Sequence, residues 1–157
     1  MKDIIRGNRE VAVLLEEENY KGYNYYITFT HNASFCIYIQ VPVNKVEEYS
    51  EVISDVFYPD DAFDCLKWAG LYKVTGMKYL GYDFAKPDYL PNNELMKEYI
   101  EMTDANKAEY CFNKHILEEY KASNENNMLM YGSKGDMTQD KCRDICKEAI
   151  DRLANIE

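Results

Sequence analysis

The chain has 157 residues, a length typical of one domain, and its 46% hydrophobic and 29% charged residues are typical of globular rather than disordered or fibrous proteins. Its 18 Lys and Arg against 28 Asp and Glu leave a net charge of −10, which disfavours direct binding to nucleic acids or to an anionic membrane. We therefore expect a single domain over residues 1–157 whose partners are not polyanions.

The longest apolar runs, Val11–Leu15 and the stretch around Phe35–Val43, are much shorter than the roughly 18 residues that a membrane span needs. The N-terminus lacks the apolar segment of a secretory signal, so we expect the chain to stay in the compartment where it is made. Five cysteines, an odd number at apolar positions, indicate reduced thiols of a cytosolic protein rather than a disulfide framework.

Two strands are predicted over residues 23–30 and 35–41, where β-branched and aromatic residues are dense. The polar segment between them has the composition of a short hairpin connection. Pro42 has no N–H to donate, so the second strand is expected to end there or to run along a sheet edge.

Residues 43–69 alternate charged residues with scattered aromatic ones, and they are expected to form a long excursion with about one helical turn. Tyr58-Pro59-Asp60-Asp61 within this excursion is a turn signal. Two further strand-like stretches, 70–75 and 78–84, are predicted to form a second hairpin that turns near Thr75-Gly76.

The periodicity changes from strand-like to helix-like near Pro87, and a helix is predicted from about residue 93. The last residues, 136–157, predict a helix that docks on the sheet by one apolar stripe, with Asp136 and Gln139 at the spacing of a capping box. The expected architecture is α+β: a four-stranded, mainly antiparallel sheet packed against helices of the C-terminal half.

Residues suited to metal binding or nucleophilic catalysis are few. Cys142 and Cys146 stand four apart on the predicted terminal helix, but no second Cys or His pair lies at zinc-finger spacing, so core packing is the preferred interpretation. His31 and His115 would activate a cysteine only through tertiary contacts that the sequence does not fix. No glycine-rich loop precedes a Lys-Ser or Lys-Thr pair, which excludes P-loop nucleotide hydrolysis. We expect neither a metal nor a cofactor.

Carboxylates and tyrosines are the two features that suggest a site. Carboxylates cluster around Asp60 and again at Asp83 and Asp88, where they could hold a cation or share a proton, although solvated acidic surface is the commoner outcome. The 15 tyrosines supply large amphipathic contact area of the kind enriched at interfaces. Several of them crowd the predicted second hairpin: Tyr72, Tyr79, Tyr82 and Tyr89.

Several motifs follow one another in this chain: Lys21-Gly22-Tyr23, an aromatic hairpin that closes at Val41-Pro42, Gly70-Leu71-Tyr72, Leu80-Gly81-Tyr82-Asp83-Phe84-Ala85 and a Cys-bearing last helix. This order resembles a group of small uncharacterised proteins of phages and prophages of Gram-positive bacteria. In that group the third strand reads His-Gly-Gly-Leu-Thr-Tyr and the fourth reads Gly-Phe-Asp-x-Ala-His-x-x-Asp. The resemblance covers about residues 20–90 and, more weakly, 136–153, so that residues 92–135 look like a helical insertion.

This chain departs from the group at two positions. Trp68 and Lys86 stand where the group has its two histidines, whereas Asp83 and Asp88 fit its acidic positions. Any metal binding or proton transfer by those histidines would be lost here. The resemblance implies a phage context and the host cytoplasm, where small acidic phage proteins often disarm host immunity by binding.

Three functions follow as hypotheses. The preferred one is a non-enzymatic anti-defence protein, an acidic inhibitor of a host immune protein such as a CRISPR-type or other nuclease, because an acidic face can occupy a cationic nucleic-acid channel. The second is a sponge that traps a nucleotide immune signal between neighbouring protomers of a homo-oligomer, through stacked rings and paired lysines. The third is a hydrolase that uses the aspartates around Asp83. The candidate binding residues are Trp68, Tyr72, Tyr82, Asp83, Lys86 and Asp88.

Overall fold

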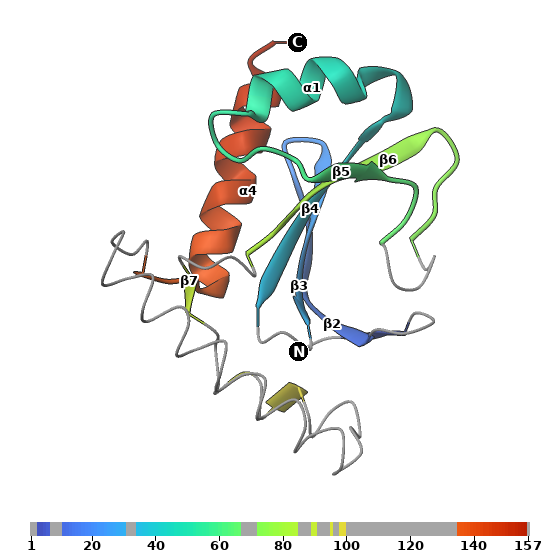
Figure 1. Ribbon diagram of the computed structural model, residues 1–157. Coiled ribbons are helices and arrows are strands. Elements are labelled where there is room, and N and C mark those ends of the chain that lie inside the picture. The colour runs from blue at the N-terminus through green and yellow to red at the C-terminus, as the bar shows by residue number, and fades with distance from the viewer. Residues whose placement is uncertain are drawn as a thin grey trace.

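A six-stranded antiparallel sheet forms the centre of the protein, with strand order β1-β2-β3-β4-β6-β5 (Figure 1). The computed structural model describes residues 3–6, 11–30, 34–66, 72–84, 89–90, 95, 98–99 and 135–156. The strands of this sheet are β1 (Asp3–Arg6), β2 (Val11–Tyr20), β3 (Tyr23–Thr30), β4 (Phe35–Pro42), β5 (Asp61–Phe63) and β6 (Met77–Asp83). A second, parallel pair consists of β7 (Tyr89–Leu90) and β8 (Gly135–Asp136).

The α+β class with an antiparallel sheet is confirmed, and the predicted strands 23–30, 35–41 and 78–84 lie close to β3, β4 and β6. The predicted number of four strands is wrong, because six strands pair in the described part of the sheet. The strand predicted over 70–75 is also wrong where the structure describes it. Residues 72–76 are turns and irregular chain there, closed by a hydrogen bond from the Met77 N–H to the Val74 carbonyl at 3.1 Å.

Residues 43–66, the described part of the predicted excursion over 43–69, are more regular than expected. They begin with the 3₁₀ turn η1 (Val43–Lys45) and the helix α1 (Val46–Ile53), and they later contribute β5 to the edge of the sheet. The helix α1 buries Tyr49 and Ile53 against the sheet, which explains why such a short helix is retained. The predicted insertion over 92–135 lies almost wholly outside the described residues.

The helix α4 (Gln139–Ala154) runs along one face of β3 and β4, and α1 lies on the same face (Figure 1). Five α4 side chains on one stripe are fully buried, and they form part of the main core with the inner residues of the sheet: Cys142, Cys146, Ala149, Ile150 and Leu153. The predicted capping residue is wrong, because the cap is Thr138 rather than Asp136. The Thr138 hydroxyl accepts a hydrogen bond from the Lys141 N–H at 3.1 Å.

A second, smaller core lies on the other face of the sheet, which we call the outer face. There the side chains of Tyr26, Tyr38 and Tyr79 are almost completely buried, and Leu66 and Tyr72 of the connection between β5 and β6 pack on them. Both faces of the sheet therefore carry apolar side chains that are covered, and neither face is a bare apolar surface in the described part of the chain.

Replacing Gly81 by alanine will destabilise the protein by about 1–3 kcal/mol, because the new methyl group overpacks the outer face. A Cβ atom at Gly81 would lie 2.6 Å from Cδ1 of the buried Tyr38 ring. Urea unfolding of the variant measures this cost. In a Tyr38→Leu background the ring is absent, so Gly81→Ala should cost much less there; the same cost in both backgrounds would refute the steric explanation.

Candidate functional site

The structure separates the two tyrosines of the sequence-predicted site. Tyr82 packs on the helix-covered face, where its ring centroid lies 5.0 Å from that of Phe84. Tyr72 packs on the outer face, with its ring centroid 5.3 Å from that of Tyr26. Because the sheet lies between them, the two rings cannot stack on one ligand within one chain. Trp68, Lys86 and Asp88 lie outside the described residues.

Asp83, the remaining predicted residue, lies at the end of β6. Its carboxylate accepts a hydrogen bond from the Ser34 hydroxyl at 3.4 Å, and its main-chain N–H donates to the Asp60 carboxylate at 3.1 Å. The Asp60 N–H in turn donates to the Gly81 carbonyl at 2.8 Å. Asp83 is thus joined to the connection between α1 and β5, where another group of carboxylates begins.

Cys36 lies opposite Asp83 in the pairing of β4 with β6, but its surroundings do not activate the thiol. Burial and the neighbouring Asp83 charge raise the pKa of the Cys36 thiol well above its usual value. A thiol of this kind stays protonated and is a poor nucleophile. Among the described residues, no group of three or more His, Cys, Asp or Glu side chains could hold a metal ion. The hydrolase hypothesis gains no activated nucleophile from this cluster.

The strongest surface feature is residues 46–64, which we call the acidic segment. It contains seven acidic residues and no Lys or Arg, and all seven are exposed: Glu47, Glu48, Glu51, Asp55, Asp60, Asp61 and Asp64. Across the described residues, thirteen Asp and Glu side chains are exposed, against three Lys. The described surface is therefore strongly negative, and the exposed carboxylates are most closely spaced along the acidic segment.

Tyr58 stands out from the middle of the acidic segment. Its side chain is 74% exposed, whereas its neighbours Phe57 and Pro59 are buried and fix the chain on either side. The ring is therefore held outward by a loop that is anchored to the core. The Asp61 carboxylate accepts the N–H of Ala62 at 2.8 Å, which occupies an amide of the edge strand β5 and makes pairing with a further strand less favourable.

Among the described residues, three ion pairs at the surface oppose the charge of the acidic segment. Lys45 lies 3.4 Å from Glu48, Arg152 lies 3.5 Å from Asp55, and Lys78 lies 3.4 Å from Asp64. Exposed pairs at these distances are weak and screened by salt, so their carboxylates can exchange one cationic partner for another. The sequence already indicates this surface, because residues 46–64 contain seven Asp and Glu residues and no Lys or Arg. The prediction instead placed the site at the tyrosines of the second hairpin.

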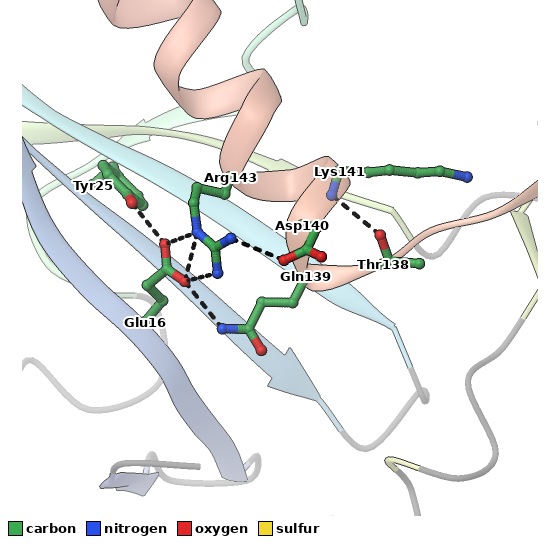
Figure 2. A network of polar contacts seen from close by, with 7 residues as sticks. All are labelled: Glu16, Tyr25, Thr138, Gln139, Asp140, Lys141 and Arg143. Carbon is green, nitrogen blue, oxygen red and sulfur yellow. Dashed lines mark hydrogen bonds and ion pairs between the residues drawn. The ribbon is translucent and has the colours of Figure 1, made fainter.

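A β-bulge in β2 brings a carboxylate onto the helix-covered face. The register between β2 and β3 shifts between Leu14 and Glu16, and strand alternation would otherwise point Glu16 to the outer face. Figure 2 shows the result: the Glu16 carboxylate accepts hydrogen bonds from Arg143 and Gln139 of α4 and from the Tyr25 hydroxyl. The guanidinium of Arg143 also binds Asp140 at 2.8 Å.

This network fixes α4 to the sheet rather than serving as a catalytic centre. Burial of Glu16 raises its pKa, but the hydrogen bonds from Arg143, Tyr25 and Gln139 outweigh that effect and lower the pKa to about 2. A carboxylate with so low a pKa is a poor proton acceptor near neutral pH. Because its oxygens are occupied by three partners, Glu16 acts as a structural ion-pair partner between β2 and α4.

No protein-family model, no curated protein and no solved structure matches this chain. Within the described part of the chain, no helix combines the length and the apolar composition that crossing a membrane requires.

Proposed function

We propose that this protein is a phage-encoded anti-defence protein that acts by binding, as an acidic inhibitor of a host immune protein such as a CRISPR-type or other nuclease. The observation that carries the proposal is the acidic segment, with seven exposed carboxylates and the projecting Tyr58. The phage resemblance supplies the context, and the host cytoplasm would be the place of action.

The partner surface that fits the acidic segment is a cationic one. Proteins that hold DNA or RNA line their channels with Lys and Arg to neutralise phosphates. Carboxylates on an anchored segment can occupy such a channel, and charge complementarity speeds the encounter of the two proteins. Tyr58 adds the aromatic contact that interface hot spots favour, and the face of its ring can receive a guanidinium group.

The acidic segment replaces the second hairpin as the preferred contact surface. Tyr72 and Tyr82 are both partly buried on opposite faces of the sheet, whereas Tyr58 and the carboxylates around it are exposed together. Asp83 adjoins the acidic segment through its hydrogen bond to Asp60, so one residue of the sequence-predicted site borders the proposed surface.

A plating assay tests the proposal. Phage is plated on bacteria that carry a CRISPR nuclease with a spacer against that phage, with and without expression of this protein. Expression should raise the plating efficiency at least tenfold. The double variant Glu47→Lys, Glu51→Lys should lose most of this protection, because like charges would meet across the interface. The matched control Glu17→Lys, Glu18→Lys makes the same charge change at exposed positions of β2 and should protect as the wild type does.

Two outcomes would overturn the proposal in different ways. Absence of protection by the wild-type protein in strains carrying CRISPR, restriction or other nuclease-based defences would refute the anti-defence function. Equal loss in the test and control variants would show that general charge, not the acidic segment, determines binding. If the partner is isolated, affinity should fall steeply as salt rises, because the exposed carboxylates are screened within about 10 Å at 0.1 M salt.

A further inference from the structure

Lysines and carboxylates are segregated in part of the structure. The acidic segment has seven carboxylates and no Lys or Arg, whereas three other segments contain four lysines and no Asp or Glu: residues 21–22, 42–45 and 73–78. We call these three segments the basic end, because the fold brings them together. The protein therefore has a cationic surface as well as an anionic one, although its net charge is −10.

Strand pairing and a main-chain hydrogen bond join the segments of the basic end. Pro42 pairs with Met77 where β4 meets the start of β6, and the Val43 N–H donates to the Gly76 carbonyl at 2.8 Å. The turn between β2 and β3 adjoins them, since Lys21, Pro42 and Met77 all line one pocket of about 290 Å³. A pocket of this size is at the lower end for ligand pockets and has room for one aromatic ring.

The basic end exposes apolar side chains beside its lysines. Val43 and Val74 are two of the four large apolar residues that are exposed on the described surface. Lys73 is exposed next to Val74 and makes no ion pair with a described residue. The other three lysines are in solvent-exposed ion pairs, in which a competing carboxylate can replace the present one: Lys21, Lys45 and Lys78. This combination of apolar and cationic groups fits a partner that is both apolar and anionic.

We propose that the basic end binds the acidic segment of a second copy of this chain. The two surfaces are complementary in charge, and Tyr58 projects from the acidic segment as a ring that the pocket beside Pro42 and Met77 can receive. Tyr58 does not line the pocket of its own chain. Lys45 directly precedes α1 and Tyr58 follows it, so a helix about 12 Å long separates the pocket side from Tyr58 within one copy. The copies therefore associate head to tail.

This association is expected to be weak. Repulsion between net charges of −10 opposes it, but at about 0.15 M salt the Debye length is about 8 Å, so that repulsion is largely screened while charges in contact still attract. A small contact of this kind corresponds to a Kd on the order of 0.1 mM. The inference does not depend on the proposed inhibitor function, because it involves no host protein. A partner that covers the acidic segment would compete with the second copy.

Sedimentation equilibrium of the full chain at about 0.15 M salt tests the contact. The average mass of the wild-type protein should be close to one chain at about 10 μM and should reach at least two chains at about 0.5 mM. Tyr58→Lys and the double variant Lys73→Glu, Val74→Asp should stay monomeric at both concentrations. The matched control Lys141→Glu, Ile156→Asp makes the same kinds of change at exposed positions outside both surfaces and should associate as the wild type does.

Mixing the two defective variants shows which surfaces meet. Tyr58→Lys keeps an intact basic end, and Lys73→Glu, Val74→Asp keeps an intact acidic segment. One complete contact can therefore form between the two variants, although neither variant can form it with itself. An equimolar mixture should contain complexes of two chains, and no larger ones.

Each of three results would contradict the inference. The first is a wild-type protein that stays monomeric up to about 0.5 mM, a concentration well above the expected Kd. The second is association that the variants of the two surfaces leave at wild-type strength, or that the control Lys141→Glu, Ile156→Asp weakens equally. The third is a mixture of the two defective variants that stays monomeric although the wild type associates, which would show that the copies meet through other surfaces.

Discussion

Replacing Glu16 by glutamine will lower the free energy of unfolding by about 3 kcal/mol at pH 7. The hydrogen bonds from Arg143, Tyr25 and Gln139 outweigh the effect of burial and hold the pKa of Glu16 at about 2, against an ordinary value of 4.5. This difference measures how much more the folded protein favours the carboxylate than the unfolded chain does. Glutamine keeps the shape of the side chain but cannot carry the charge that Arg143 pairs with.

The cost of Glu16→Gln should depend on pH in a defined direction. Because folding lowers the pKa of Glu16, the charged group stabilises the protein fully above pH 4.5, and this contribution disappears as the pH falls towards 2. The difference in stability between wild type and variant should therefore be constant from pH 7 to about 5.5, and less than half of it should remain at about pH 3. Urea unfolding at several pH values measures the difference directly.

Glu17→Gln is the control for this experiment. Glu17 is the next residue of β2 but its side chain is exposed, so its replacement should change stability by less than about 0.5 kcal/mol at pH 7. A Glu16→Gln variant as stable as wild type at pH 7, or a difference that does not shrink in acid, would mean that the network does not hold the charged carboxylate as the geometry indicates.

The strands were predictable where local composition and tertiary environment agree. β3 and β4 are continuous runs of β-branched and aromatic residues, and both are buried almost throughout. β2 was missed because three glutamates, beginning with Glu16, follow the short apolar run Val11–Leu15 and interrupt the strand pattern. The bulge accommodates this interruption, since it places Glu16 against α4 while Glu17 and Glu18 stay in solvent. Nothing in the local pattern indicates that a helix more than 120 residues later supplies the counter-charge.

Two other errors have physical causes that local sequence does not reveal. Tyr72 has a residue type typical of strands, but its carbonyl accepts a hydrogen bond from the Tyr79 hydroxyl instead of a ladder partner. The chain then turns at Gly76, which has a φ of 80°, and the strand β6 begins only after this turn, at Met77. The helix α1 is only eight residues long and its N-cap, Lys45, makes no side-chain capping bond. Its stability comes from the burial of its apolar stripe, which appears only when the sheet is present.

The prediction that Tyr72 and Tyr82 share one surface patch is wrong, because the face on which each side chain lies depends on tertiary structure. Tyr82 is two residues from Leu80 in β6 and two from Phe84 just after it, so the three side chains share one face, which is the helix-covered one once β6 pairs with β4. Tyr72 is not in a strand, and it packs on the outer face together with Leu66, another described residue of the connection between β5 and β6. The acidic segment, in contrast, could be recognised from sequence alone, because exposed charge needs no tertiary partner to remain at the surface.

Replacing Ile150 by alanine in α4 will lower the free energy of unfolding by about 3–4 kcal/mol, among the largest effects of any single truncation. Ile150 is completely buried between α4 and the sheet, in the stripe that covers the helix-side core. Truncation loses the transfer free energy of three carbon atoms and leaves a cavity that close-packed neighbours cannot fill. With total stabilities of about 5–15 kcal/mol in domains of this size, the variant should unfold at markedly lower urea concentration.

Ile145→Ala is the matched control, since it makes the same chemical change on the same helix at a partly buried position. Alanine has a higher helix propensity than isoleucine, and this gain is common to both variants, so the difference between their unfolding free energies reports packing alone. We expect Ile145→Ala to cost about 1 kcal/mol, leaving a difference of about 2–3 kcal/mol. Equal losses of unfolding free energy in the two variants would contradict the conclusion that the buried stripe holds α4 on the sheet. They would indicate that the ion pair between Arg143, near the start of α4, and Glu16 of β2 holds the helix instead.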